Sequence, residues 1–155
     1  GALLGPPKSE HVLEGIRYEL LRELCEQVGI AYNLRPVSEA DVRSADELLL
    51  SSATKEVVAV THLDGEPVGH GALRGKVGPV YARLLEAYQQ AKAQQAVVDI
   101  ALMFDPAFDA ATIERRPSSG GKYLGVTLTV NATSRQQLDD LYRGLSAHPL
   151  VKVVL

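Results

Sequence analysis

The strongest constraint on the fold is a strict alternation of apolar and hydroxyl side chains within residues 123–131. Val126, Leu128 and Val130 alternate there with two threonines. A period of two is typical of a strand in a sheet that buries only one of its faces. The pattern therefore predicts a strand over residues 123–131 in a one-sided sheet, and it is the clearest strand signal in the chain.

The segments around this strand predict the rest of a small α+β unit. Asp105-Pro106 ends the first helix, and Ser134 with Gln137 has the spacing of a capping box that begins the second. In order, the predicted elements are a helix over 96–104, an edge strand over 112–117, the strand over 123–131, a helix after Ser134 and a closing strand over 150–155. This order becomes a ferredoxin-like βαββαβ sandwich when one strand is added in front.

The preceding residues predict another mixture of short helices and strands. Apolar residues from Tyr18 to Val28 recur at helical spacing, and Gly29 ends that helix. Cys25 lies on its apolar face, which favours a core residue over a reactive thiol. Further signals are a Ser38–Asp41 cap, strands over 46–52 and 55–61, a hairpin turn at Asp64-Gly65, and a helix that begins at Gly78-Pro79 and extends or joins through 91–95.

Composition excludes several classes of protein. The 16 basic and 19 acidic residues give a net charge of -3 and form no basic run, so nucleic acid is not an expected partner. No apolar run approaches the length of roughly 20 residues that a membrane helix needs. One cysteine and four scattered histidines supply neither a disulfide nor a metal site. We expect a soluble globular protein in the reducing cytoplasm.

Residues 95–155 carry motifs that identify a resemblance. The motifs are RPSSGGKY at 116–123, VTLTVNAT at 126–133, Leu141-Tyr142, and VKVVL at 151–155. They resemble the YbeD-like family, which implies an ACT-like fold of a kind often used for small-molecule regulation, and no catalytic motif. The family's first strand, which lies in the middle of its sheet, has no counterpart here.

Residues 1–94 resemble a different family, the C-terminal part of class IV aminotransferases, such as the D-amino-acid and branched-chain enzymes. The motifs are Gly5-Pro6-Pro7 before VLEGI at 12–16, Leu20-Leu21-x-x-Leu24, Ala45-Asp46-Glu47, SSATKEVVAV at 51–60, LDGEPVG at 63–69, and Gly78-Pro79. The resemblance implies pyridoxal phosphate as the cofactor.

By this resemblance, the contacts to the cofactor phosphate would be Ile16, Arg17, Ala53 and Thr54. A helix N-terminus and hydroxyl side chains suit a phosphate group physically. The family motif carries threonine where Arg17 stands, so that hydroxyl is missing. The structural alternatives are a core role for Ile16 and a turn role for Thr54.

The catalytic part of such an enzyme has no match in the chain. The Schiff-base lysine and the acidic partner of the pyridine nitrogen lie upstream of this region in the family, and the six lysines here fit surface charges better. We therefore expect a two-part protein, residues 1–94 and 95–155, with no catalytic residues of its own and no transamination alone. Any residual chemistry would act on D-amino acids, with a lysine from another chain. The alternative is a regulatory module that binds a small amino-acid-like ligand or a protein through the ACT-like sheet.

The absent first strand predicts a gap in the C-terminal sheet. Unpaired backbone groups cost on the order of 1–3 kcal/mol each when they are buried, so a strand should fill the gap. Residues 55–61 are the internal candidate, and a strand from a second chain is the other, which would give a homodimer or a complex with a partner.

Overall fold

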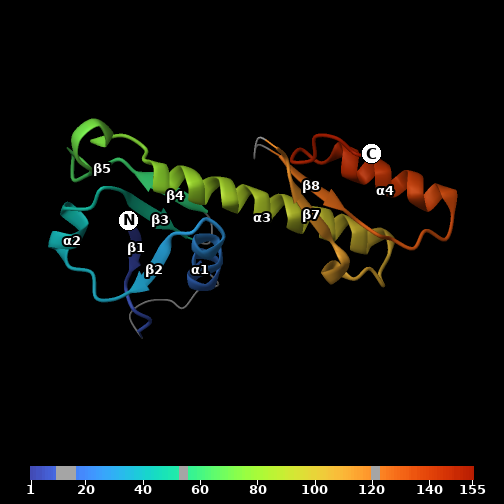
Figure 1. Ribbon diagram of the computed structural model, residues 1–155, viewed down its shortest axis with the longest axis horizontal. Coiled ribbons are helices and arrows are strands. Elements are labelled where there is room, and N and C mark those ends of the chain that lie inside the picture. Colours follow the sequence, from blue (N-terminus) through green and yellow to red (C-terminus); the bar gives the residue numbers. More distant parts are fainter. Residues whose placement is uncertain (10–16, 53–55, 120–122) are drawn as a thin grey trace. The chain divides into compact units, whose positions relative to one another are not determined.

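The computed structural model describes residues 1–9, 17–52, 56–119 and 123–155 (Figure 1). Within them the chain divides into two compact units, Gly1–Tyr88 and Gln89–Leu155. The predicted mixture of helices and short strands is confirmed in both. None of the helices described is long and apolar enough to cross a membrane.

The N-terminal unit contains three two-stranded pairings. Strands β1 and β2 are parallel, β3 and β4 are antiparallel, and β5 and β6 form a hairpin. The elements are β1 (Ala2–Gly5), α1 (Arg17–Gln27), β2 (Ala31–Leu34), α2 (Glu39–Arg43), β3 (Leu48–Ser51), β4 (Val57–Val60), β5 (His62–Leu63), β6 (Glu66–Pro67), a 3-10 turn at Gly71–Leu73, and the first part of α3 (Pro79–Phe104).

Helix α1 follows its predicted pattern. Leu24 and Cys25 are buried, and Gly29, with φ of +64°, occupies the left-handed region that ends many helices. The hairpin between β5 and β6 also has the predicted turn, since Asp64 and Gly65 both have positive φ, as a type I′ turn requires. The Ser38–Asp41 capping box at α2 is confirmed as well.

Glu47 holds the start of helix α3 from 33 residues away. Its two carboxylate oxygens accept hydrogen bonds from the backbone N–H groups of Val80 and Tyr81, at 2.9 and 3.0 Å. A carboxylate suits this position because a helix N-terminus carries free N–H groups and a positive partial charge. Gly78 makes room for it, because a Cβ there would lie 2.2–2.6 Å from the Glu47 side chain.

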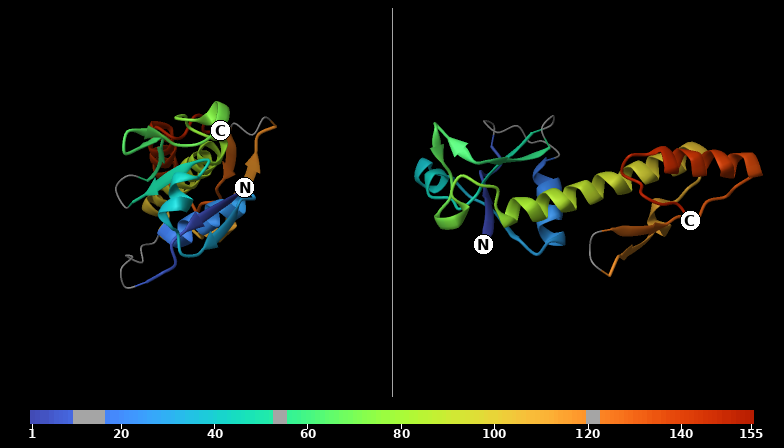
Figure 2. Two further views of the ribbon diagram at one scale, coloured as in Figure 1. Left: turned by 90° about the vertical axis from the view of Figure 1, so that its left-hand side faces the viewer. Right: turned by 90° about the horizontal axis from the view of Figure 1, so that it is seen from above.

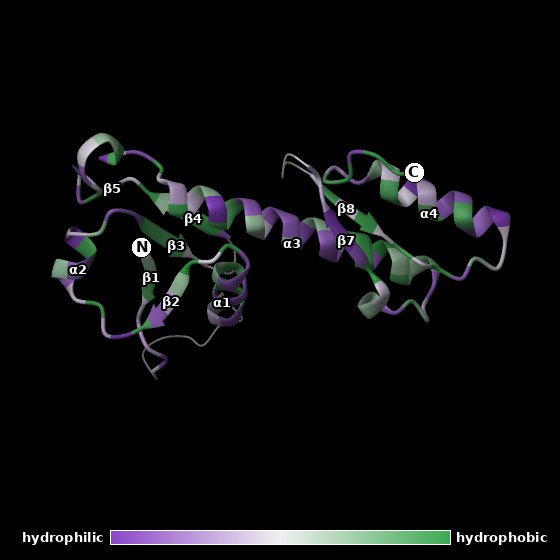
Figure 3. Cartoon of the chain, viewed as in Figure 1, coloured by the Kyte–Doolittle hydropathy of each residue, from purple (hydrophilic) through white to green (hydrophobic). Residues whose placement is uncertain are grey.

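The C-terminal unit packs two helices against one hairpin. Its elements are the remainder of α3, a 3-10 turn at Ala110–Thr112, β7 (Glu114–Pro117), β8 (Leu124–Thr127) and α4 (Arg135–Ala147). Both helices lie on the same side of the antiparallel β7–β8 pair (Figure 2). Helix α4 is striped with apolar and polar residues (Figure 3), and its buried residues are Leu141 and Leu145.

The predicted alternation of part-buried and exposed residues is confirmed around Val126, but the strand that pairs is shorter than predicted. Val126, Leu128 and Val130 are part-buried and pack against two clusters, one of Val97, Leu141 and Leu145 and one of Ala101, Phe108 and Ile113. The residues between them are exposed. Only Leu124–Thr127 pair with β7, because Thr127 pairs with Glu114, the first residue of β7.

Two predictions about the sheet were wrong. Residues 150–155 form no strand, because a strand needs a neighbour for its backbone hydrogen bonds and none of the described strands pairs with them. Residues 55–61 do not fill the gap either, since β4 pairs with β3 inside the N-terminal unit. The gap beside β8 is therefore not closed from within the described chain.

We predict that Gly78→Ala destabilises the N-terminal unit by about 1–3 kcal/mol, because the new methyl group displaces the Glu47 carboxylate and leaves two helix N–H groups unpaired. Urea unfolding and amide hydrogen exchange at Val80 and Tyr81 measure this. Glu47→Ala provides the control background. There the second substitution should cost less than about 0.5 kcal/mol, and an undiminished cost would exclude Glu47 as the cause.

Candidate functional site

The predicted phosphate contacts lie mostly outside the described residues. Ile16, Ala53 and Thr54 belong to the segments 10–16 and 53–55, which the structure does not describe. Arg17 is the first residue of helix α1, and only its backbone is described. Their role at a cofactor therefore stays a prediction.

The described residues beside the hydroxyl loop have two unusual features. The Ser51 hydroxyl oxygen is buried and has no hydrogen-bond partner among the described residues. On the other side, Glu56 has φ of +47°, an uncommon conformation for a residue other than glycine. The backbone N–H of Ser52 donates to the Glu56 carbonyl at 3.3 Å and closes the loop between them.

The Ser51 hydroxyl fits a phosphate group in its donor chemistry. A hydroxyl without a partner among the described residues is a donor that a phosphate oxygen can accept from, and Ser51 lies two residues before the predicted contact Ala53. The described lysines, in contrast, do not suit the covalent step, in which a lysine forms a Schiff base with the cofactor. A Schiff-base lysine must be desolvated, and the four lysines described, Lys8, Lys76, Lys92 and Lys152, are all exposed. This agrees with the prediction that they are surface charges.

Cys25 and His70 have structural surroundings in the described part of the chain. Cys25 is completely buried, and burial raises the pKa of its thiol, which lowers the fraction of nucleophilic thiolate. His70 is used structurally, through a hydrogen bond of its ring to the Ser44 carbonyl at 3.1 Å. Within the described ranges, no group of three or more His, Cys, Asp or Glu side chains is arranged to hold a metal ion.

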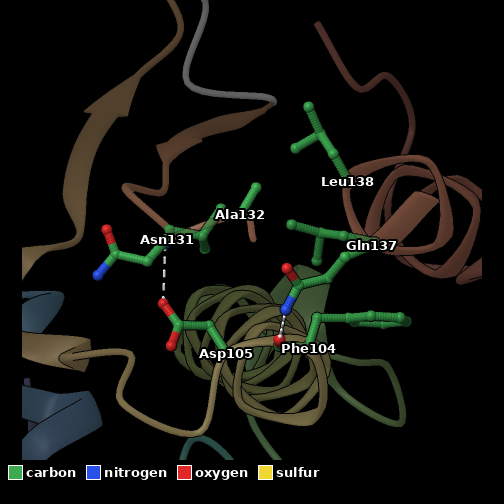
Figure 4. A pocket seen from close by; sticks show the side chains of 8 residues that line it. Phe104, Asp105, Asn131, Ala132, Gln137 and Leu138 are labelled. Carbon is green, nitrogen blue, oxygen red and sulfur yellow. Dashed lines mark hydrogen bonds between the residues drawn. The ribbon is translucent and has the colours of Figure 1, made fainter. Parts of the chain in front are cut away.

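The C-terminal unit has a small hollow between the end of α3 and the start of α4 (Figure 4). Asp105 is its buried charged residue, at 8% exposure. One carboxylate oxygen accepts from the Asn131 N–H at 2.9 Å, and the other accepts from the Ala107 N–H at 3.1 Å. Both oxygens are thus engaged in holding the end of α3 to the segment after β8.

Gln137 joins the same two helices on the other side of the hollow. Its side-chain amide donates to the carbonyl of Phe104, the last residue of α3, and its oxygen accepts from the Thr133 N–H at 2.6 Å. The predicted capping box is confirmed for Ser134, whose hydroxyl accepts from the Gln137 N–H at 3.1 Å. The reciprocal bond goes to Thr133 and not to Ser134. The sequence signals marked these residues as helix ends and did not reveal that they link the helices.

The backbone of β8 has one edge without a neighbour. Ser118 and Tyr123 are a hydrogen-bonded pair, at 2.8 Å, and pairing alternates along an antiparallel ladder. Leu124 and Val126 are therefore in non-hydrogen-bonded positions, and their N–H and C=O groups point away from β7. No hydrogen bond from any described residue reaches these outward groups.

The outer edge of β7, in contrast, is protected against pairing with a further strand. By the same alternation, Arg115 and Pro117 direct their backbones outward, and proline has no N–H to donate. Glu114, Arg115 and Arg116 add charges along that strand, which is a common way to prevent edge pairing. Residues 123–134 contain no charged side chain. The open edge of β8 is therefore the better position for an added strand.

Two family models match the chain. The family described as "Protein of unknown function (DUF493)" matches residues 86–155, and the family described as "Amino-transferase class IV" matches residues 1–63. Both resemblances predicted from the sequence are confirmed.

Similar proteins agree with these two matches. A UPF0250 protein of Leptothrix cholodnii is 64% identical over 61 residues, which cover 39% of this chain and 67% of that protein. A UPF0250 protein of Bordetella parapertussis is 59% identical with the same coverage. The solved branched-chain amino acid aminotransferase from Escherichia coli matches with a TM-score of 0.51 and 31% identity, over 57% of this chain. The chain spans only 28% of that enzyme.

We predict that Asp105→Ala destabilises the C-terminal unit by about 1–3 kcal/mol, because it leaves two backbone N–H groups without acceptors. Chemical denaturation measures the change. Asp99→Ala is the matched control on the same helix, where an exposed carboxylate accepts one hydrogen bond from Gln95. The control should lose no more than about 0.5 kcal/mol, and equal losses would contradict the proposed linkage of α3 to residue 131.

We predict that Ser51→Ala, unlike Asp105→Ala, does not lower the free energy of unfolding. Removing a buried hydroxyl without a partner should leave stability unchanged or raise it by up to about 1–2 kcal/mol. Thermal unfolding of the ligand-free protein measures this. Ser44→Ala is the comparison, because its hydroxyl donates to the Ala40 carbonyl at 2.7 Å. A clear loss of stability for Ser51→Ala would mean that its hydroxyl does have a partner.

Proposed function

Because the chain belongs to the UPF0250 family through its C-terminal part and carries at its N-terminus only part of a class IV aminotransferase, we propose that it works as a binding module. The site is the C-terminal unit, and residues 1–155 do not transaminate alone. The ligand is an extended peptide segment or a small amino-acid-like molecule. We place the protein in the cytoplasm.

The observation that carries this proposal is the open edge of β8. The outward backbone groups of Leu124 and Val126 are a template for a further strand, and strand addition is a common mode of peptide recognition. The apolar row of Val126, Leu128 and Val130 already packs against both helices. A ligand at this edge would therefore complete a sheet whose buried face is already in place.

We further propose that residues 89–155 are a ferredoxin-like, ACT-like sandwich without its first strand. Their order of helix, strand, strand and helix supports this arrangement, with the added strand in the position of the missing one. Amide hydrogen exchange tests the site, since binding should slow exchange within residues 123–131. A ligand that leaves exchange there unchanged does not bind at this edge.

The second candidate function is pyridoxal-phosphate chemistry on D-amino acids, with a lysine supplied by another chain. The match to class IV aminotransferases and the unpartnered Ser51 hydroxyl favour it. When bound, the cofactor would supply an electron sink for carbanions. In this chain Ile16, Arg17, Ala53 and Thr54 would hold its phosphate, together with Ser51.

Titration with pyridoxal phosphate, followed by borohydride reduction and mass spectrometry, separates the two functions. We expect no cofactor trapped on a single lysine and no transamination of D-alanine with a 2-oxo acid. Reversible binding that weakens about tenfold in Ser51→Ala would support a phosphate site without a catalyst. Stoichiometric trapping on one lysine would contradict our proposal and establish an enzyme.

A further inference from the structure

We propose that the strand added to β8 comes from a second copy of this chain, and that it consists of residues 151–155. Two copies would exchange these residues reciprocally and form a two-fold dimer. This inference rests on the proposed function and names its partner. It follows from the state of residues 151–155, from the chemistry of the β8 edge, and from the hinge between α4 and the C-terminal segment.

The apolar row of the C-terminal segment is mostly exposed in a single copy. With a strand's period of two, Val151, Val153 and Leu155 form one row of VKVVL, and Lys152 and Val154 form the other. Val153 is 72% exposed and Leu155 is fully exposed. Val151 and Val154 pack instead on the cluster of Leu141 and Leu145, at a spacing of three that no strand has. The segment therefore has one fully apolar row that a strand could bury, and in a single copy it forms no strand.

The β8 edge has the complementary chemistry. Its outward backbone groups lack partners, and residues 123–134 contain no charge that would repel an apolar strand. An added strand would place its apolar row on the face of Val126, Leu128 and Val130, which both helices cover. The hollow lined by Phe104, Leu138 and Leu141 is also lined by Val130 and adjoins the segment that follows β8. Lys152 and Val154 would then lie on the open side of the sheet.

A short hinge links the segment to its own unit. Helix α4 ends at Ala147, and His148-Pro149-Leu150 connects it to the segment. Three hydrogen bonds hold the segment in a single copy, and the longest joins the Lys152 ammonium group to the Pro149 carbonyl at 3.5 Å. The Tyr142 hydroxyl donates to the Val154 carbonyl at 2.8 Å, and the Val151 N–H donates to the His148 carbonyl at 3.0 Å. Exchange of the segment between copies needs only these contacts and the packing of Val151 and Val154 to be replaced, and exchanged elements of this kind are a recognised route to dimers.

Two neighbouring substitutions in the full chain test the inference by sedimentation or light scattering, at protein concentrations from about 1 to 100 µM. Val153→Glu puts a charge in the row that would be buried, and Lys152→Glu puts one in the row that would face solvent. Both side chains are exposed in the single copy, so neither change should impair folding, which circular dichroism verifies. Tyr142→Phe removes one tether and should raise the dimer fraction.

We expect the wild type and Lys152→Glu to dimerise alike, and Val153→Glu to dimerise about tenfold more weakly or worse. A wild type that stays monomeric, or a dimer that Val153→Glu does not weaken, would overturn the exchange. Hydrogen exchange on the same samples separates this outcome from a failure of the proposed function. Protection of residues 123–131 by another ligand in a monomer would retain the binding site with a different occupant, and its absence under every condition would overturn both.

Discussion

The C-terminal unit depends on the burial of one apolar row on two helices. Val126, Leu128 and Val130 pack on side chains from α3 and α4 at once, so this row connects the hairpin to both helices. Full burial of such a side chain contributes about 1.5–3 kcal/mol, and these three are part-buried. Asp105, directly after α3, accepts a hydrogen bond from the Asn131 backbone, and Gln137, in the first turn of α4, donates one to the Phe104 carbonyl at the end of α3. The open backbone edge of β8 therefore lies next to an apolar core that is already packed. A strand added there would gain side-chain packing as well as hydrogen bonds.

The N-terminal unit is organised by contacts between its family motifs. The carboxylate of Glu47, from the Ala45-Asp46-Glu47 motif, caps the helix that begins after Gly78. Gly69, from the LDGEPVG motif, has φ of +89° and approaches the Asp46 carbonyl so closely that a Cβ would lie 2.7 Å from it. These motifs therefore have a structural explanation that does not require catalysis. Among the motif residues described, Ser51 has a buried side-chain oxygen without a hydrogen-bond partner in the described chain.

The sequence predicted the elements of the fold more fully than the candidate site. Helix α1, the Asp64-Gly65 turn and the alternating burial around Val126 were all predicted, since each depends on residues a few positions apart. The link from Gln137 to Phe104 was not, because it depends on which segments become neighbours. The family's missing first strand predicted a gap in the sheet and offered two occupants, residues 55–61 and a strand from a second chain. The first was wrong, since β4 pairs with β3, and the second stays a prediction.

Local patterns along the chain were enough to predict the two-part organisation, the helix ends, and the face of residues 123–131 that is buried. These follow from short-range periodicity, from caps and from the backbone restrictions of glycine and proline. The pairing of β4 with β3, the Glu47 cap on α3, and the absence of a strand at residues 151–155 depend instead on contacts between distant segments. A pattern of apolar residues specifies which face of a strand is buried, but a ladder also needs a second backbone at about 4.8 Å. Beside β8 that backbone is absent from the described chain, so a sequence suited to a strand stays unpaired.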